Sequence, residues 1–148
     1  MIYIGSDHGG YRLKETIKKW LVEWQFEFTD LGADSYDPND DYPDYAKLVG
    51  QAVAKEEGAR GILICRSGIG IAVAANKIKG VRAGTVTIPA QADVAVKDED
   101  MNILALPADY IDEETIKKIV EKYCNGTFSS AERHARRLEK IKALEIHG

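Results

Sequence analysis

The sequence of 148 residues has no long hydrophobic run, few cysteines and no strong excess of charge. No apolar segment approaches the roughly 20 residues that a helix needs to cross a bilayer, so we expect no membrane-spanning segment. The residues from Met1 to Asp7 show no basic region followed by an apolar run, and they do not resemble a signal peptide. A net charge of −4 argues against nucleic acid as the main partner. We therefore expect a cytoplasmic protein that binds neither membranes nor nucleic acid.

The sequence also lacks the residue spacings of metal sites. Its two cysteines, Cys65 and Cys124, are far apart in the chain, and in a cytoplasmic protein we expect both to be reduced. One acidic loop lacks the spacing of a calcium-binding loop, and we expect it to be solvated; its acids are Asp34, Asp37, Asp40 and Asp41.

Short apolar segments typical of buried strands alternate with longer segments of helical periodicity. We expect strands at about 2–4, 26–31, 62–64, 81–86 and 102–106, and helices at about 11–24, 43–57, 71–77, 89–99, 113–125 and 130–146. This alternation predicts an α/β fold, a Rossmann-like three-layer α/β/α sandwich around a five-stranded parallel sheet. The segment from Ser130 to about Ile146 adds a charged C-terminal helix. No repeat, linker or low-complexity segment divides the chain, so residues 1–148 are expected to form one domain.

The stretch from Gly61 to Lys77 is the part of the chain best suited to chemistry. Its pattern predicts a buried strand, then a turn that contains Cys65 and two glycines, and then an Ala-rich helix. Such a turn leaves backbone N–H groups directed at one place, and the helix N-terminus favours a thiolate there. A small cysteine at the end of a strand can also be ordinary core. Because the glycine turn accompanies it, we interpret Cys65 as catalytic.

Other suggestive residues accompany the ends of strands, where ligands bind in sheets of this type. Ser6, Asp7 and His8 follow the first strand, and we group the acidic run 98–100 beside the fifth strand with them. In the last helix, Arg133 and Arg137 are four residues apart and share one face, which suits a phosphate clamp. The alternative is a solvated basic face paired with Glu132 and Glu139.

Three other features have simpler interpretations. We expect Trp20 and Trp24 to pack in the core, because apolar stripes at helical spacing usually do. Cys124, near the end of an amphipathic helix, is also expected to pack. His134 is open to a phosphate contact, a subunit contact or a surface position, and His147 in the tail is uninformative.

Together these motifs resemble the type B ribose-5-phosphate isomerase family, which includes the bacterial galactose-6-phosphate and allose-6-phosphate isomerases. The likeness covers nearly the whole chain and rests on six segments in the same order, namely Ser6–Gly10, Asp41–Ala46, Gly61–Lys77, Gly80–Ala83, Asn102–Ala105 and Arg133–Arg137. The resemblance implies an aldose–ketose isomerase, an intramolecular oxidoreductase. Such an enzyme moves a proton between C1 and C2 of a sugar phosphate through an enediolate, without a metal or another cofactor.

The resemblance also implies roles for individual residues. Cys65 is the base and Ser67 exchanges a proton with the substrate oxygens. The backbone N–H groups from Ser67 onward form an oxyanion cradle, which involves Gly68, Ile69, Gly70 and Ile71. Asp7, His8 and Tyr42 line the sugar site, and the phosphate contacts His8, Arg133 and Arg137. The family forms homodimers, or dimers of dimers, in which neighbouring subunits share each site.

Four positions depart from the family pattern. Asp98 stands where the family has a histidine assigned to sugar-ring opening, and Glu99 replaces an asparagine that contacts substrate. Arg66 replaces the glycine after the cysteine, and Asp109 replaces a basic residue. An exposed aspartate is nearly always ionised, whereas ring opening needs a group that titrates near neutrality. We nevertheless assign ring opening to Asp98, and substrate contacts to Arg66 and Glu99.

The departures leave three interpretations open. The substrate can lack a ring, as a tetrulose phosphate does; Asp98 can serve ribose 5-phosphate; or Arg66 and Glu99 can pair across the site. The predicted reaction is the interconversion of ribose 5-phosphate and ribulose 5-phosphate. Alternatives are isomerisation of a tetrulose 4-phosphate, allose 6-phosphate or galactose 6-phosphate, and a non-catalytic module that binds a sugar phosphate.

Overall fold

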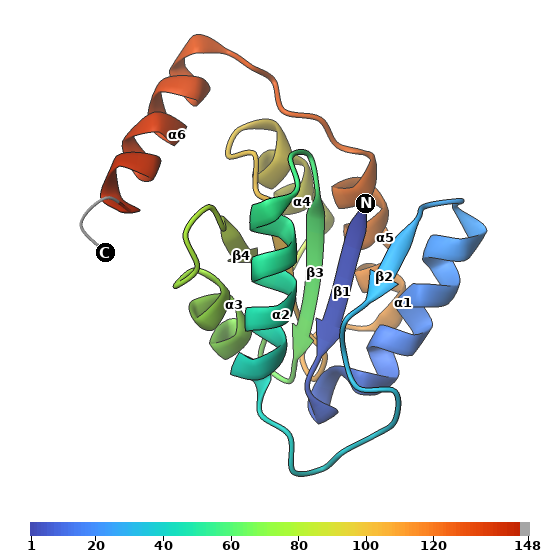
Figure 1. Ribbon diagram of the computed structural model, residues 1–148. Coiled ribbons are helices and arrows are strands. Elements are labelled where there is room, and N and C mark those ends of the chain that lie inside the picture. The colour runs from blue at the N-terminus through green and yellow to red at the C-terminus, as the bar shows by residue number, and fades with distance from the viewer. Residues whose placement is uncertain (146–148) are drawn as a thin grey trace.

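The computed structural model describes residues 1–145 and has a five-stranded sheet at its centre, with strand order β2-β1-β3-β5-β4 (Figure 1). All neighbouring strands are parallel. The strands are β1 (Ile2–Ser6), β2 (Phe28–Asp30), β3 (Arg60–Cys65), β4 (Ala83–Thr85) and β5 (Ile103–Pro107). The helices are η1 (His8–Gly10), α1 (Tyr11–Glu23), α2 (Tyr42–Lys55), α3 (Ile69–Ala75), α4 (Pro89–Lys97), α5 (Glu113–Asn125) and α6 (Glu132–Leu144).

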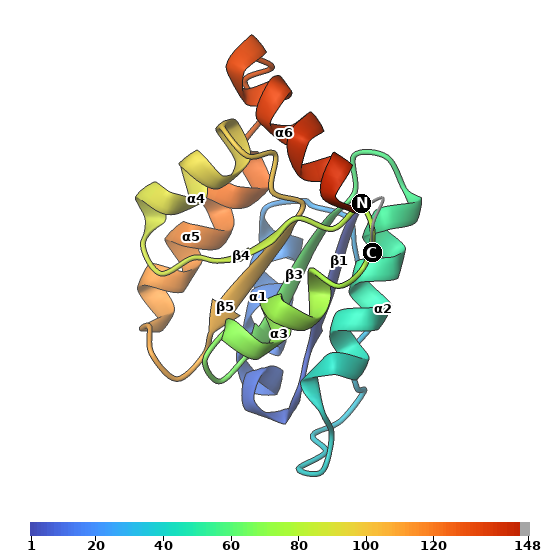
Figure 2. The same cartoon turned by 90° about the vertical axis from the view of Figure 1, so that its left-hand side faces the viewer.

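Helices cover both faces of the sheet, which confirms the predicted three-layer sandwich (Figure 2). In β3, Ile62 and Ile64 face the core formed with α1, α4 and α5, which includes Trp20. Leu63 and Cys65 face the core formed with α2 and α3. This alternation follows from the two-residue period of a strand. Because both faces of β3 are covered, its sequence is apolar throughout rather than alternating.

Because all strands run in the same direction, the sheet has two distinct edges at the ends of its strands. We call the side where the strands end the carboxyl edge, and the side where they begin the amino edge. In Figure 1 the arrowheads of β1 and β3 mark the carboxyl edge at the bottom of the view. β3 runs for six residues between the two edges, which corresponds to about 17 Å at the usual rise of a strand.

α6 lies at the amino edge and stands apart from the three layers (Figures 1 and 2). The segment that leads to it is tied to the start of β3, where the Arg60 guanidinium donates to the Gly126 carbonyl over 2.6 Å. At the far end of α6, the Gly80 N–H donates to the Glu145 carboxylate over 2.8 Å. His134 is the one residue of α6 that is buried.

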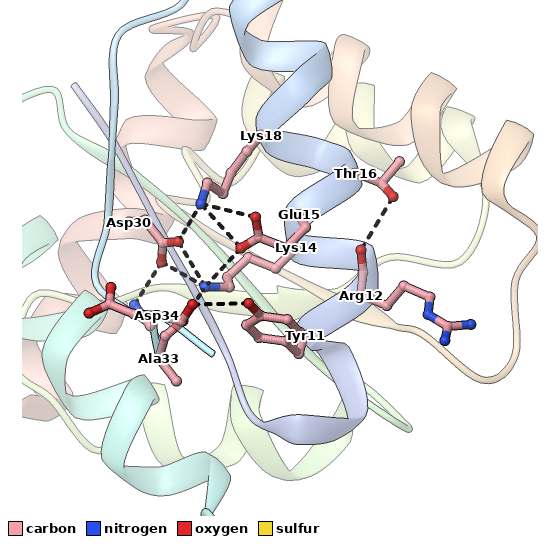
Figure 3. Close-up of polar contacts among 10 residues, drawn as sticks. Tyr11, Arg12, Lys14, Glu15, Thr16, Lys18, Asp30, Ala33 and Asp34 are labelled. Carbon is pink, nitrogen blue, oxygen red and sulfur yellow. Dashed lines mark hydrogen bonds and ion pairs between the residues drawn. The ribbon is translucent and has the colours of Figure 1, made fainter. Parts of the chain in front are cut away.

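The loop between β2 and α2 has no regular structure, and a buried ion pair holds its start (Figure 3). The Lys14 side chain is 0% exposed, and its ammonium donates to both oxygens of Asp30, over 3.0 and 2.8 Å, and to the Ala33 carbonyl over 3.1 Å. Asp30 also accepts from Lys18 over 2.8 Å and from the Gly32 N–H over 2.8 Å. Burial tends to raise the pKa of Asp30, but these donated hydrogen bonds outweigh it and lower the pKa. Every proton of the buried ammonium therefore has an acceptor.

The predicted elements agree with the observed ones except at their ends. α3 begins at Ile69 rather than Ile71, because Gly68 adopts a left-handed conformation, with φ of +71°, and stands as the residue before the helix. β2 and β4 are shorter than predicted and cover three residues each. The predicted end of the last helix at Ile146, and His147, lie outside the described residues. Within residues 1–145, none of the helices has the length and apolar character of a membrane span.

Candidate active site

The turn after β3 encloses Cys65, which is 3% exposed. Its Sγ accepts a hydrogen bond from the Gly68 N–H over 3.1 Å and lies 4.0 Å from the Ser67 hydroxyl. The Ser67 Oγ in turn accepts from the Ile69 N–H over 3.1 Å. A donated N–H stabilises negative charge on the sulfur. The turn thus brings a thiol, a hydroxyl and the start of a helix together.

Two of the N–H groups expected in the oxyanion cradle are engaged inside the protein. Gly68 donates to Cys65, and Ile69 donates to Ser67. Gly70 and Ile71 belong to the first turn of α3, where N–H groups have no partner within the helix. Of the N–H groups predicted for the cradle, those of Ser67, Gly70 and Ile71 therefore remain without an acceptor among the hydrogen bonds of the described residues.

Gly68 shapes the turn because no other residue fits there. A Cβ on Gly68 would lie 2.9 Å from the backbone of both Leu106 and Pro107. Its carbonyl accepts from the Thr85 hydroxyl over 2.7 Å. The turn is therefore packed directly against β4 and β5, and Thr85 is a supporting residue that the sequence alone did not reveal.

Tyr42 meets this turn from the start of α2. A Cβ on Gly70 would lie 2.7 Å from Cζ of the Tyr42 ring and 2.9 Å from its hydroxyl, so the ring packs on the glycine. Tyr42 is 38% exposed. The structure thus brings Tyr42, which the resemblance assigns to the sugar site, beside the cysteine turn.

Asp7 and His8 follow β1 at the same edge. The Asp7 carboxylate caps η1 by accepting from the Gly10 N–H over 3.2 Å. Asp7 is buried, and burial raises its pKa despite that hydrogen bond. Ser6, the last residue of β1, is also buried, and its hydroxyl has no partner among the described residues.

His8 is held by an acid that the sequence analysis assigned to a solvated loop. Asp40 Oδ1 accepts from the His8 backbone N–H over 2.8 Å and lies 2.8 Å from Nδ1 of the ring. The Asp40 side chain is only 8% exposed, so the expectation of a solvated carboxylate is wrong for this residue. The two residues are 32 positions apart, and no spacing in the sequence could have linked them.

Arg66 extends from the turn into an open cleft of about 920 Å³. Its guanidinium lies 3.3 Å from the Asp109 carboxylate, and its side chain packs over Gly9, where a Cβ would collide with it. His8 and Arg12 line the same cleft, whereas Cys65 does not. Within one chain, Arg66 therefore pairs with Asp109 and not with Glu99.

The other predicted site residues lie at the amino edge, because they precede β5 or belong to α6. This corrects the grouping of residues 98–100 with the carboxyl ends of strands. Asp98 ends α4, and its Oδ1 lies 3.6 Å from Nε2 of His134. The other ring nitrogen, Nδ1, is 2.7 Å from the Ser129 hydroxyl. His134 is 5% exposed, so a surface position is wrong for it, and it anchors α6 beside Asp98.

The two candidate clamp residues, Arg133 and Arg137, are exposed on α6. The predicted alternative was a face on which they pair with Glu132 and Glu139. Instead, Glu132 pairs with Arg136 over 3.1 Å. Among the described residues, neither Arg133 nor Arg137 makes a salt bridge.

The predicted site residues thus form two clusters. The carboxyl-edge cluster contains Asp7, His8, Tyr42, Cys65, Arg66, Ser67 and the residues 68–71, and the amino-edge cluster contains Asp98, Glu99, Arg133 and Arg137. The length of β3, about 17 Å, separates them, so a single chain does not bring them together.

Comparison with known proteins relates this chain to sugar-phosphate isomerases. A family model described as Ribose/Galactose Isomerase matches residues 2–141. A probable ribose-5-phosphate isomerase B of Mycoplasma genitalium is 41% identical over 145 residues, which are 97% of this chain and 95% of that protein. The ribose-5-phosphate isomerase B of Escherichia coli K12 is 40% identical over 144 residues, covering 97% of this chain and 95% of that protein.

Solved structures agree with these sequence matches. The crystal structure of ribose-5-phosphate isomerase B from Mycoplasma genitalium with bound ribulose 5-phosphate is similar to this chain, with a TM-score of 0.94 and 40% identity. The match covers 99% of this chain and 97% of the other. The enzyme of Clostridium thermocellum gives a TM-score of 0.94 at 39% identity, with coverage of 99% and 97%.

The packing of Gly68 predicts a large effect of Gly68→Ala. Gly58 is a matched control, because its φ is +78° and a Cβ there would meet nothing within 4 Å. Both variants lose about 1 kcal/mol from the left-handed conformation. Gly68→Ala should lose a further 1–3 kcal/mol, roughly, through the clash with β5. Urea unfolding of the two variants measures this difference, and equal losses would contradict the proposed packing.

Proposed function

The chain belongs to the ribose/galactose isomerase family and is an aldose–ketose isomerase, and on this premise we propose that it interconverts ribose 5-phosphate and ribulose 5-phosphate. Relatives that match it over almost its whole length at about 40% identity are named ribose-5-phosphate isomerase B. The observation that carries the proposal is the turn at residues 65–71, where Cys65 and Ser67 adjoin free N–H groups at the start of α3.

In this proposal Cys65 is the base of the proton transfer. The thiolate removes the proton from C2 of the open-chain aldose, and the electron pair moves to the carbonyl oxygen to give an enediolate. Return of the proton to C1 gives the ketose, while Ser67 exchanges a proton between the two substrate oxygens. The Gly70 and Ile71 N–H groups stabilise the enediolate oxygen. A positioned base contributes about 10²–10⁴-fold to such a rate, and an oxyanion donor contributes a comparable factor.

We further propose that two chains complete each site. Of the two arginines that line the cleft at the carboxyl edge, Arg66 is paired with Asp109, whereas α6 carries Arg133 and Arg137 exposed and without salt bridges among the described residues at the opposite end. In a two-fold dimer, α6 of each chain can lie against the carboxyl edge of its partner. This arrangement joins the two clusters and forms two equivalent sites in each dimer. Exposed apolar side chains suited to such an interface occur on both surfaces, namely Leu48, Ile69 and Val73 near the site and Ile141 and Leu144 on α6.

The remaining role in the proposal is ring opening, which we assign to Asp98 together with His134. Their side chains are 3.6 Å apart, and an imidazole can both donate and accept a proton. The pair thus combines a carboxylate that can reach the substrate with a group that can hold a proton. Glu99, the next residue, is proposed to contact the sugar.

A second candidate substrate follows from Asp98 itself. If the residue that replaces the family's histidine cannot open a ring, a four-carbon sugar phosphate is the better substrate, because its phosphate occupies the hydroxyl that would close the furanose. The alternative of a non-catalytic binding module finds no support, since the matched relatives are named as isomerases.

Cys65→Ala should abolish isomerisation of ribose 5-phosphate, with a loss of about 10³-fold or more. Cys124→Ala is the matched control, because burial raises the pKa of Cys124 to about 12 and its thiol stays protonated. Iodoacetamide should inactivate the wild-type enzyme and the Cys124→Ala variant alike, and ribose 5-phosphate should protect both. An alkylated Cys65 with full turnover would rule out the thiolate base.

A shared site predicts complementation between two inactive variants. Cys65→Ala damages the carboxyl-edge cluster, and the double variant Arg133→Ala/Arg137→Ala damages the amino-edge cluster. After unfolding and joint refolding of equal amounts, about half of the dimers are mixed and each has one intact site, which restores about a quarter of the wild-type activity. If each chain holds its own complete site, mixing restores nothing.

Asp98→Asn separates the two candidate substrates. With ribose 5-phosphate we expect kcat/KM to fall about 10²-fold, because the carboxylate that exchanges a proton with the ring is lost. With erythrose 4-phosphate, which is open-chain, we expect little change. If kcat/KM falls equally with both substrates, Asp98 positions the substrate and does not open the ring. A wild-type preference for erythrose 4-phosphate would favour the second candidate.

A further inference from the structure

The structure assigns to Asp40 a positioning role, in which its carboxylate fixes the His8 ring and stabilises the cationic form of the ring, which presents Nε2–H to an oxyanion of the substrate. The inference rests on the proposed function for the identity of that oxyanion, a sugar phosphate. The effect of Asp40 on His8 itself is a property of the free protein.

The geometry of the contact determines which nitrogen is available. One oxygen, Oδ1 of Asp40, accepts from the His8 backbone N–H and from ring Nδ1, each over 2.8 Å. An ionised carboxylate is only an acceptor, so Nδ1 carries the proton. Nε2 is then the ring nitrogen left for a ligand, and it has no hydrogen-bond partner among the described residues. The His8 side chain is 25% exposed and lines the open cleft.

The loop that carries Asp40 is fastened on both sides of it. At its start, Lys14 and Asp30 form the buried ion pair, and the Tyr11 hydroxyl donates to the Asp34 carbonyl over 3.1 Å (Figure 3). At its end, α2 begins two residues after Asp40. The ring of Tyr36 lies edge-on to His8, with centroids 6.2 Å apart. The carboxylate is therefore held against His8 by contacts on both sides of the loop.

The charges around His8 favour the cation. Its hydrogen bond to Asp40 is the largest influence and raises the pKa of His8; Asp7 raises it further, whereas partial burial and Arg66 oppose this. The same cleft is also lined by charged side chains of α1, of the turn after β5 and of α5, namely Arg12, Glu15, Asp109 and Glu113. Because the pKa is raised, the cation is complete below the ordinary value and is lost as the pH rises through the raised one.

A cationic donor matters most for a phosphate. A charge-assisted hydrogen bond to a phosphate oxygen is shorter and stronger than one from a neutral imidazole. Neutral His8 would still donate through Nδ1 to Asp40, and Nε2 would then be an acceptor that faces an anion without a proton between them. Loss of the cation should therefore weaken binding of the substrate, and change the chemistry at Cys65 much less.

The test is Asp40→Asn, with Asp34→Asn as the matched control. In Asp40→Asn the new amide oxygen can still accept from the His8 backbone N–H, so the loop keeps its anchor while the charge is removed. Asp34 lies in the same loop and is exposed, so its variant makes the same charge change away from His8. Two readouts are measured across pH 5–9, roughly the range in which a histidine titrates. They are the NMR titration of the His8 ring without ligand, and KM and kcat for ribose 5-phosphate.

We expect a lower His8 pKa in Asp40→Asn than in the wild type, and no change in Asp34→Asn. Near pH 8, KM of Asp40→Asn should be about tenfold higher, with kcat changed less, and the difference should disappear at acidic pH. Binding of inorganic phosphate, followed by the His8 signal, should weaken in the same pH range. Asp40→Glu, which restores the carboxylate, should move the titration back toward that of the wild type.

Several outcomes would overturn the inference. If the His8 titration is unchanged in Asp40→Asn, Asp40 has no electrostatic effect on His8. If KM rises equally at every pH, Asp40 has only a structural role. In a double-mutant cycle, Asp40→Asn should add nothing to His8→Gln, and additive losses would show that Asp40 acts elsewhere. If Asp40→Asn does not fold, Asp40→Ser, which also removes the charge, supplies the same comparison of the His8 titration with the wild type. A wild-type enzyme without turnover of ribose 5-phosphate would defeat the proposed function and leave the titration result standing.

Discussion

The direction of the five parallel strands decides where this protein can do chemistry. Because all carboxyl ends meet at one edge, the end of β3 and the segments that follow β1 and β5 lie there, and they bring Cys65, His8 and Asp109 to the same edge of the sheet. The same constraint sends the residues before β5 to the opposite edge, with α6 beside them. A chain of this topology cannot fold its two clusters of candidate residues onto each other. Assembly of two chains is then the simplest way to unite a proton-transfer turn with a pair of arginines. α6 stands apart from the three layers, so it is available to contact a second chain.

A second constraint operates on the irregular loop between β2 and α2. A loop without regular structure places a side chain accurately only if other contacts fix it. Here a fully buried ammonium, Lys14, fixes the start of the loop. A buried charge without partners is strongly unfavourable, and this one has a carboxylate and a carbonyl as acceptors. The pair therefore ties the start of the loop to α1, because Asp30 and the Ala33 carbonyl both lie against Lys14. That arrangement delivers Asp40 to His8.

Much of the fold could be predicted from the sequence because its signals are local. Apolar runs, helical periodicity and the glycine turn each depend on neighbouring residues, and they indicated the sheet, the layers and the surroundings of Cys65. The contact of Asp40 with His8 joins positions that only the folded chain brings together, so the loop acids looked alike in the sequence. The start of α3 was displaced by two residues because the left-handed conformation of Gly68 depends on its contact with β5. The placement of Asp98 was an error of topology, since a residue before a strand lies at its amino end.

The positions that depart from the family pattern are not independent of one another. Arg66 and Asp109 face each other at 3.3 Å, so the arginine gained on one side of the cleft is matched by the carboxylate gained on the other. Both side chains are largely exposed, at 60% and 46%, and such a pair contributes little to stability. Its effect is on the cleft, where it keeps one cation beside His8 and Arg12 without adding net charge. Asp98 has His134 as a neighbour at 3.6 Å, and this histidine belongs to the Arg133–Arg137 segment that the chain shares with the family pattern. The four departures together make the candidate site more negative, because Asp109 replaces a basic residue and Asp98 and Glu99 add two further carboxylates, whereas Arg66 alone adds a positive charge. Arg66 therefore offsets part of this change, and it does so beside His8.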